Sequence, residues 1–209
     1  MPSEFNALVL GASGLVGSAL VELLLADSRY QKVTCLVRKP MQNSQFNDVA
    51  GKLEPIVIDY QKLEDYQGYF VAEHIYVCLG TTIKKAGSKS AFRKVDFEYV
   101  HIAAQLARAQ RTKSFVWISS VGANAKSGSF YLRVKGELEN AIFAMSGLDN
   151  ATAVRPSLLL GERQESRLAE HLGIQFAQLL SPMMFGLLAK YKPICAQDVA
   201  AQMITLQQF

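Results

Sequence analysis

The chain has 209 residues, of which half are hydrophobic and 19% are charged, so it can build a large core and is not wholly disordered. The net charge of +4 fits an anionic ligand, but the basic residues are scattered, and we expect no nucleic-acid partner. Three widely separated cysteines argue against a disulfide framework and a zinc site.

Short apolar runs alternate with helical patterns along the chain. The runs are Ala7–Leu10, Val33–Val37, Pro55–Ile58, Ile75–Leu79, Phe115–Ile118 and Thr152–Val154. Continuous apolar runs are typical of strands that are buried on both faces, as in parallel sheets. Helical spacing of apolar residues recurs within Phe92–Leu106 and Val134–Met145. We therefore predict an α/β fold, a doubly wound parallel sheet of Rossmann type in one domain, residues 1–209.

The first strand is followed directly by a helical pattern that contains Gly11, Gly14 and Gly17. In a dinucleotide-binding turn, the first glycine permits the tight turn and the second lets the backbone approach a pyrophosphate. The third lets the helix pack closely on the sheet. The helix N-terminus adds unpaired N–H groups and a positive dipole end. The spacing alone is also compatible with a glycine-rich turn that binds nothing.

The second predicted strand ends with Arg38 and Lys39, where a site for NAD usually has an acidic residue. A guanidinium suits a 2′-phosphate, so we expect NADP(H) to be preferred over NAD(H). A surface arginine at a strand end is the alternative. Asp59, after the third strand, could accept a hydrogen bond from the adenine amino group, and an ordinary turn aspartate fits nearly as well.

The fifth predicted strand ends with Ser119 and Ser120, at the edge where open α/β sheets bind ligands. Tyr131 and Lys135 follow on a predicted helix, four residues apart and therefore on one face. Hydride transfer to a carbonyl needs a proton donor, and a neighbouring ammonium favours the phenolate form of a tyrosine. Tyr131 could then act as general acid or base, with Ser120 holding the carbonyl oxygen and Lys135 binding ribose hydroxyls. The alternative is a half-buried aromatic residue and a surface lysine.

Four stretches together resemble the short-chain dehydrogenase/reductase superfamily: "GASGLVG", "CLGTTIKKAGSKSAFRKVDFEYV", "ISSVGANAKSGSFYLRVKGELE" and "RPSLLLGERQESR". The similarity is to its atypical branch, which contains the Tat-interacting, metastasis-suppressor type and bacterial NAD(P)-binding relatives. The resemblance implies NADP(H) in a Rossmann domain and a catalytic triad of Ser120, Tyr131 and Lys135. Implied cofactor contacts are Gly11, Ser13, Gly14, Leu15, Val16, Gly17, Arg38, Asp59, Leu79, Gly80, Thr81, Lys135, Arg155, Pro156 and Ser157.

The chain departs from the superfamily pattern at two places. Asp96 stands where many members have an active-site asparagine, which puts the usual proton relay in doubt. Only about fifty residues follow Pro156, so residues 157–209 can provide only a short substrate-side segment. The substrate pocket is then small, open, or completed by a protein partner or a second copy of the chain.

Three functions follow from these patterns. The first is an NADP(H)-dependent oxidoreductase that acts on a small carbonyl or alcohol. The second is a non-catalytic NADP(H)-sensing regulator, for which an intact Ser–Tyr–Lys set has no chemical use. The third, a sugar-nucleotide epimerase or dehydratase, would need a larger substrate domain. Fold alone does not decide between them.

The remaining patterns concern location, metals and surface charge. The first residues lack the features of a secretory signal, and residues 174–189 are too interrupted to span a bilayer, so we expect a cytoplasmic protein without membrane contact. No metal site is expected, because His74, His101 and His171 are isolated. The densest basic cluster is read as a solvated face. It consists of Lys84, Lys85, Lys89, Arg93 and Lys94.

Overall fold

The computed structural model describes residues 5–42, 45–157, 159–160 and 194–207. Within these residues, six parallel strands form one sheet in the order β3-β2-β1-β4-β5-β6, which confirms the predicted α/β Rossmann-type fold. The strands are β1 (Phe5–Leu10), β2 (Tyr30–Val37), β3 (Leu53–Val57), β4 (His74–Val77), β5 (Ser114–Ile118) and β6 (Ala151–Val154). A separate parallel pair is formed by β7 (Leu159–Leu160) and β8 (Ile194–Cys195).

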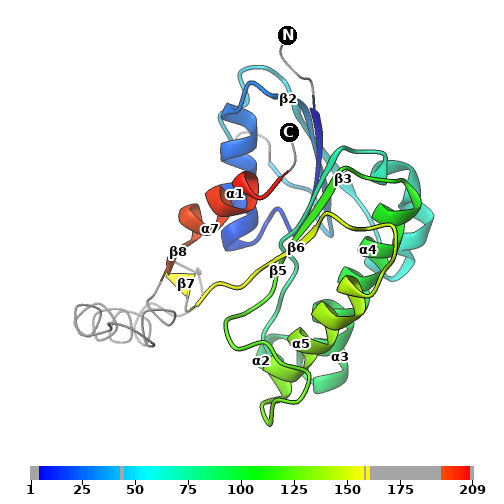
Figure 1. Ribbon diagram of the computed structural model, residues 1–209. Helices are drawn as coiled ribbons and strands as arrows, with labels where there is room; N and C mark the ends of the chain where they lie inside the picture. The colour runs from blue at the N-terminus through cyan, green and yellow to red at the C-terminus, as the bar shows by residue number, and fades with distance from the viewer. Residues whose placement is uncertain (1–4, 43–44, 158, 161–193, 208–209) are drawn as a thin grey trace.

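Helices cover both faces of the sheet (Figure 1). One face packs on α1 (Leu15–Ala26) and α7 (Ala196–Thr205), and the other on η2 (Tyr60–Phe70), α4 (Tyr99–Ala109) and α5 (Phe130–Phe143). Between β4 and α4 lie α2 (Ile83–Ala86), α3 (Lys89–Arg93) and a π-helical turn, η3 (Lys94–Glu98). Buried apolar side chains on both faces hold the layers together, because each removes apolar surface from water.

The C-terminal helix belongs to the Rossmann layer. In α7, Val199, Ala200 and Met203 are fully buried in the same core cluster as α1. Most of the predicted substrate-side segment, residues 157–209, lies outside the described residues, so its role at the substrate stays a prediction.

The predicted helix over Phe92–Leu106 is present, but its buried face differs from the prediction. The π-helical turn shifts the phase of the helix, because a π turn holds more residues than an α turn. The spacing predicts one apolar face of Phe92, Val95, Tyr99, Ile102 and Leu106. The last four of these side chains are only half-buried, so the predicted face is wrong in detail. Phe92 is buried as predicted, and the further buried residues of this stretch are Asp96, Val100, Ala103, Ala104 and Ala107.

The order of the strands reverses at β1, which pairs with β2 on one side and with β4 on the other. Ligands of open α/β sheets bind at the carboxyl ends of the strands at such a switch point. The carboxyl ends of β1, β4 and β5 lead into the glycine turn, the Leu79–Thr81 loop and Ser119–Ser120.

In the part of the chain that the structure describes, no helix is both long and apolar enough to cross a membrane. Residues 174–189 lie outside that part. The three cysteines are free thiols, and Cys35 is a fully buried core residue.

Candidate cofactor and catalytic site

The glycine turn closes tightly between β1 and α1. Gly11 has a φ of +87°, and a Cβ there would lie 2.7 Å from the backbone carbonyl atoms of Cys78. A Cβ on Gly17 would lie 2.1 Å from the Gly11 oxygen, so the third glycine serves contact of the helix with the turn itself rather than with the sheet. Gly14 differs, because its added Cβ would meet only the Gly11 oxygen, at 3.3 Å. Its outer side is open for a ligand.

The N-terminus of α1 has the features of a pyrophosphate site. Gly14 is the N-cap and provides no side-chain hydrogen bond to the first turn. Ser13 and Gly14 are exposed, whereas Val16 is buried with its side chain in the core. Any contact of Val16 with a nucleotide would therefore come from its backbone. The free N–H groups and the dipole of this helix suit an anion.

Arg38 and Asp59, at the adenine end of the predicted site, both act electrostatically on Tyr99. Burial raises the pKa of Tyr99, the Asp59 carboxylate adds to that rise, and the Arg38 guanidinium opposes it. Both charged side chains are therefore near the same phenol. Asp59 Oδ1 accepts a hydrogen bond from the Gln61 N–H at 2.9 Å and caps η2, so the turn role considered for this residue is present. Arg38 is exposed just beyond β2, where a 2′-phosphate could reach it.

A buried ion pair joins α5 to the π-helical turn. Lys135 Nζ lies 2.8 Å from Asp96 Oδ1, and the two side chains are only 3% and 1% exposed. Lys135 also donates to the Ile118 carbonyl at the end of β5, at 3.3 Å. The surface-lysine interpretation of Lys135 is therefore wrong, because its ammonium is held at the carboxyl edge of the sheet.

Asp96 also fixes the loop after β4. Its Oδ2 accepts a hydrogen bond from the Thr81 backbone N–H at 2.8 Å, and a Cβ on Gly80 would lie 3.6 Å from its Oδ1. One carboxylate thus binds the predicted catalytic lysine and the predicted cofactor loop, Leu79–Thr81. The sequence marked Asp96 only as a departure and gave no sign of this double contact.

The two serines after β5 have different environments. Ser119 is 2% exposed, and its Oγ has no hydrogen-bond partner among the described residues. Ser120 is half-buried, and its Oγ donates to the Val121 carbonyl at 3.3 Å, a long and therefore weak bond. Of the two, Ser120 has the hydroxyl that a ligand can approach.

Tyr131 lies in the first turn of α5 and is half-buried. Its ring is 5.8 Å from the ring of Phe92, centroid to centroid, so an aromatic neighbour from α3 positions it. Gly136 lets α5 approach the loop that follows Ser120, because a Cβ there would lie 2.3 Å from backbone atoms of Asn124 and Ala125. Tyr131, Lys135 and the serine loop are thereby brought to one end of the sheet.

Arg155 forms a bidentate ion pair with Glu139, at 2.9 and 2.6 Å. These hydrogen bonds raise the pKa of Arg155. Glu139 is buried one helical turn after Lys135, so the pair ties the end of β6 to α5. The resemblance placed Arg155 near the nicotinamide and gave no sign of its ion pair with Glu139. Glu139 itself could be located from the sequence, because it lies four residues after Lys135 and therefore on the same helical face. Pro156 is buried and Ser157 is half-buried just after it.

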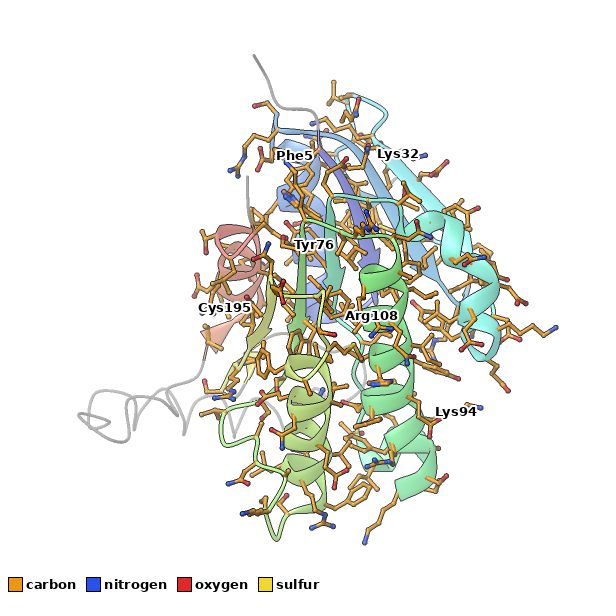
Figure 2. All side chains as sticks on the ribbon, turned by 45° about the vertical axis from the view of Figure 1, so that its right-hand side comes forward. Phe5, Lys32, Tyr76, Lys94, Arg108 and Cys195 are labelled. Carbon is orange, nitrogen blue, oxygen red and sulfur yellow. The ribbon has the colours of Figure 1, made fainter. Side chains whose placement is uncertain are left out.

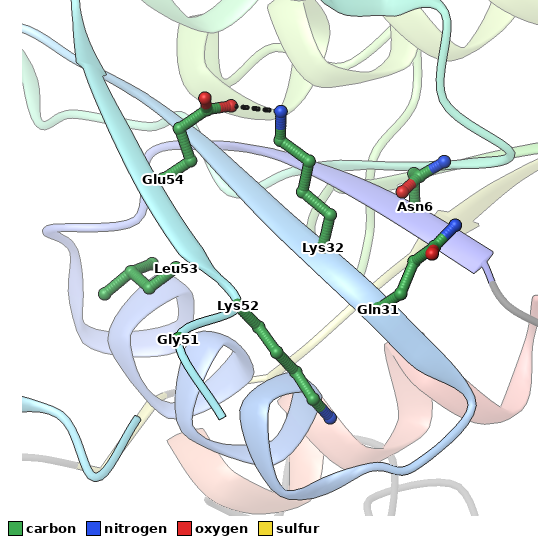
Figure 3. Close-up of a pocket in the computed structure, with 7 residues that line it drawn as sticks. All are labelled: Asn6, Gln31, Lys32, Gly51, Lys52, Leu53 and Glu54. Atoms are coloured by element: carbon green, nitrogen blue, oxygen red, sulfur yellow. Dashed lines mark ion pairs between the residues drawn. The ribbon is translucent and has the colours of Figure 1, made fainter. Parts of the chain in front are cut away.

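A hollow of about 540 Å³ lies away from this site (Figure 3). It is at the amino ends of β1, β2 and β3, and its charged groups already have partners. Lys32 pairs with Glu54 at 2.7 Å, and Lys52 Nζ donates to the carbonyls of Leu25 and Asp27. A smaller hollow of about 230 Å³ lies beside Gly136, Glu139 and Arg155.

The histidines lie apart from the site. His74 is buried at the start of β4 with its Nδ1 2.7 Å from the Tyr30 hydroxyl. His101 stacks on Phe97, and burial lowers its pKa. The described residues hold no group of three or more His, Cys, Asp or Glu that could bind a metal. His171 lies outside them.

Comparison with known proteins identifies the family. Residues 11–178 match a family model described as NAD(P)H-binding. Protein HTATIP2 of Rattus norvegicus is 37% identical over 174 residues, which cover 82% of this chain and 69% of that protein. The mitochondrial protein FMP52 of Candida albicans is 35% identical over 208 residues, which cover 97% of this chain and 88% of that protein.

Solved structures support the fold. An oxidoreductase of the short-chain dehydrogenase/reductase family from Burkholderia thailandensis superposes with a TM-score of 0.72 at 21% identity, covering 98% of this chain and 85% of that one. The Bordetella bronchiseptica enzyme WbmH, in complex with NAD+, superposes with a TM-score of 0.70 at 18% identity, covering 97% and 72%.

The expected cytoplasmic location is contradicted by the relatives. Several fungal FMP52 proteins that match this chain are named mitochondrial. The expectation rested on a missing secretory signal and a missing membrane span, and neither feature distinguishes cytoplasm from mitochondrion.

The match over residues 11–178, the two relatives and the switch-point geometry agree with one another. This chain belongs to the NAD(P)H-binding family and is of the atypical short-chain dehydrogenase/reductase type.

Proposed function

We propose that the protein is an NADP(H)-dependent oxidoreductase that acts on a small carbonyl or alcohol. The observation that carries this proposal is the buried Lys135, held by Asp96 and the Ile118 carbonyl at the carboxyl edge of the sheet. Burying an ammonium is costly unless it is paired and hydrogen-bonded. A cation kept there one helical turn from Tyr131 has an evident use in proton transfer and ribose binding.

The glycine turn and Arg38 supply the cofactor contacts in this proposal. Backbone N–H groups at the start of α1 bind the pyrophosphate, with Gly14 leaving room for it. The exposed Arg38 binds the 2′-phosphate through charge-assisted hydrogen bonds. The bound nicotinamide supplies or accepts the hydride.

The catalytic residues act at the substrate oxygen. Ser120 donates a hydrogen bond to the carbonyl oxygen, and Tyr131 gives that oxygen its proton during reduction or removes it during oxidation. Lys135 has three N–H donors, of which two are accounted for by Asp96 and Ile118 within the described residues. The third serves the nicotinamide ribose.

Asp96 replaces the asparagine that many superfamily members have. In this chain the carboxylate binds the lysine directly and binds the Thr81 N–H with its other oxygen. Asp96 therefore acts as a positioning residue, which keeps the lysine and the cofactor loop in one arrangement.

The test has two steps. Fluorescence titration with NADPH and NADH measures cofactor affinity, and absorbance at the NADPH band then follows cofactor oxidation with small aldehydes and ketones. Tight NADPH binding with turnover of at least one carbonyl supports the proposal. Tight binding without turnover across the panel would instead favour the NADP(H)-sensing regulator.

A further inference from the structure

Two cations lie over one aromatic ring next to the candidate acid. Lys89 Nζ is 5.4 Å from the centre of the Phe130 ring, and Arg133 Cζ is 5.8 Å from it. The Phe92 ring is 5.8 Å from the Phe130 ring and 5.8 Å from the Tyr131 ring. Side chains from α3 and from the first turns of α5 thus place positive charge over Phe130, whose ring has the same neighbour, Phe92, as the ring of Tyr131.

These two cations keep their charge uncompensated. Nearby, Arg93 pairs with Glu137 at 2.5 Å. In contrast, no carboxylate among residues 5–42, 45–157, 159–160 and 194–207 lies within ion-pair distance of Lys89 or Arg133. An aromatic face attracts a cation without cancelling its formal charge. Arg133 is also held in place, because its Nη1 donates to the Ser127 carbonyl at 2.8 Å.

The position of the pair fits a substrate group better than a cofactor group. Figure 1 shows α2, α3 and the start of α5 together, beyond the carboxyl ends of the strands. Helix α2 begins just after the predicted cofactor loop, Leu79–Thr81, and adds the exposed Lys84. The phosphates of a dinucleotide would bind elsewhere, at the start of α1 and at Arg38.

From this arrangement we infer that the substrate carries a carboxylate or phosphate group, which Lys89 and Arg133 bind while its carbonyl faces Tyr131. This inference rests on the proposed oxidoreductase function. It gives Lys89, a member of the basic cluster that was expected to be a solvated face, a role in substrate specificity. Guanidinium and ammonium groups form strong charge-assisted hydrogen bonds with both kinds of anion.

A pair of matched aldehydes tests the inference. We would measure kcat/KM with NADPH for 4-carboxybenzaldehyde and for benzaldehyde, and take the ratio of the two values. The wild type should favour the carboxylate, and Lys89→Gln and Arg133→Gln should each lower the ratio by about tenfold, since one charge-assisted contact is lost. Lys113→Gln is the control. Lys113 Nζ also lies over a ring, 4.8 Å from that of Phe5, but at the amino end of the sheet.

A binding measurement separates this inference from the proposed catalysis. Calorimetry of the NADP+-treated protein should show that benzoate binds more tightly than benzyl alcohol, and Lys89→Gln and Arg133→Gln should remove the difference. If benzoate binds selectively but no aldehyde is turned over, the anion site stands and the catalytic proposal fails. Equal affinities for benzoate and benzyl alcohol, or a ratio that Lys113→Gln lowers as much as Lys89→Gln does, would overturn the inference.

Discussion

Asp96 Oδ1 lies 2.8 Å from Lys135 Nζ in a buried ion pair that links the π-helical turn to α5. The link matters because each partner has a second bond: Asp96 to the Thr81 N–H, and Lys135 to the Ile118 carbonyl. The carboxyl ends of β4 and β5 are therefore joined through two charged side chains. The arrangement of the candidate site depends on both charges being present together.

A double-mutant cycle tests the energetic coupling of this pair. Asp96→Asn keeps an acceptor for the Thr81 N–H but leaves the buried ammonium without its anion, and Lys135→Met leaves the carboxylate without its cation. Each single change should lower the free energy of unfolding by about 3–5 kcal/mol. The double variant should cost less than the sum of the two, because no unpaired charge remains. Urea unfolding measures all four proteins, and additive effects would show that the pair is not coupled.

The glycine turn allows a sharp separation of binding from folding. Gly14→Val should leave the protein folded, since the new Cβ meets only the Gly11 oxygen at 3.3 Å, but it should abolish NADPH binding by filling the pyrophosphate space. Gly68→Val is the matched control, because nothing lies within 4 Å of a Cβ at that exposed glycine. Circular dichroism checks folding and fluorescence titration checks binding. A folded Gly14→Val protein with wild-type affinity would show that the site is elsewhere.

Cofactor choice should depend on Arg38. We expect NADPH to bind at least about tenfold more tightly than NADH, or about 1.4 kcal/mol, which one charge-assisted phosphate contact can supply. Arg38→Ala should remove most of this difference, because Arg38 is exposed directly after β2. Arg108→Ala, in the last turn of α4 (labelled in Figure 2), should leave it intact. Equal wild-type affinities for the two nucleotides would contradict the assignment.

Cys35 should be chemically inert in the folded protein. Burial raises the pKa of this thiol to about 12, so below that pH it stays protonated, and only the thiolate reacts. At pH 8, a thiol-modifying reagent followed by peptide mass spectrometry should leave Cys35 unmodified until urea unfolds the chain. Rapid modification in the native protein would mean that this strand is not buried as described.

The sheet could be predicted because parallel strands buried on both faces need continuous apolar runs, and six such runs are visible in the sequence. The strand bounds shift by one to three residues: β2, for example, begins at Tyr30 rather than Val33, and β3 covers Leu53–Val57 rather than Pro55–Ile58. The 3₁₀ segment η2 has no apolar periodicity that would have indicated it.

The candidate site was predictable only as a set of residue types. Spacing placed Tyr131 and Lys135 on one helical face, but hydrophobic periodicity treats a buried lysine or aspartate as a surface residue. The π-helical turn then put Asp96 on the buried face of its helix, opposite Lys135. That contact depends on tertiary packing, and so does the pairing of Arg155 with Glu139.

The measurement that tests the proposed chemistry most directly is NADPH oxidation by the wild type and by Tyr131→Phe, with a carbonyl substrate found in the screen. The phenylalanine keeps the ring that packs 5.8 Å from Phe92 but lacks the acidic hydroxyl. Turnover should fall by a factor of roughly 10² to 10⁴ while NADPH affinity changes little. Tyr69→Phe, at an exposed tyrosine of η2, should retain wild-type turnover. Undiminished turnover by Tyr131→Phe would contradict the assignment of Tyr131 as the proton donor.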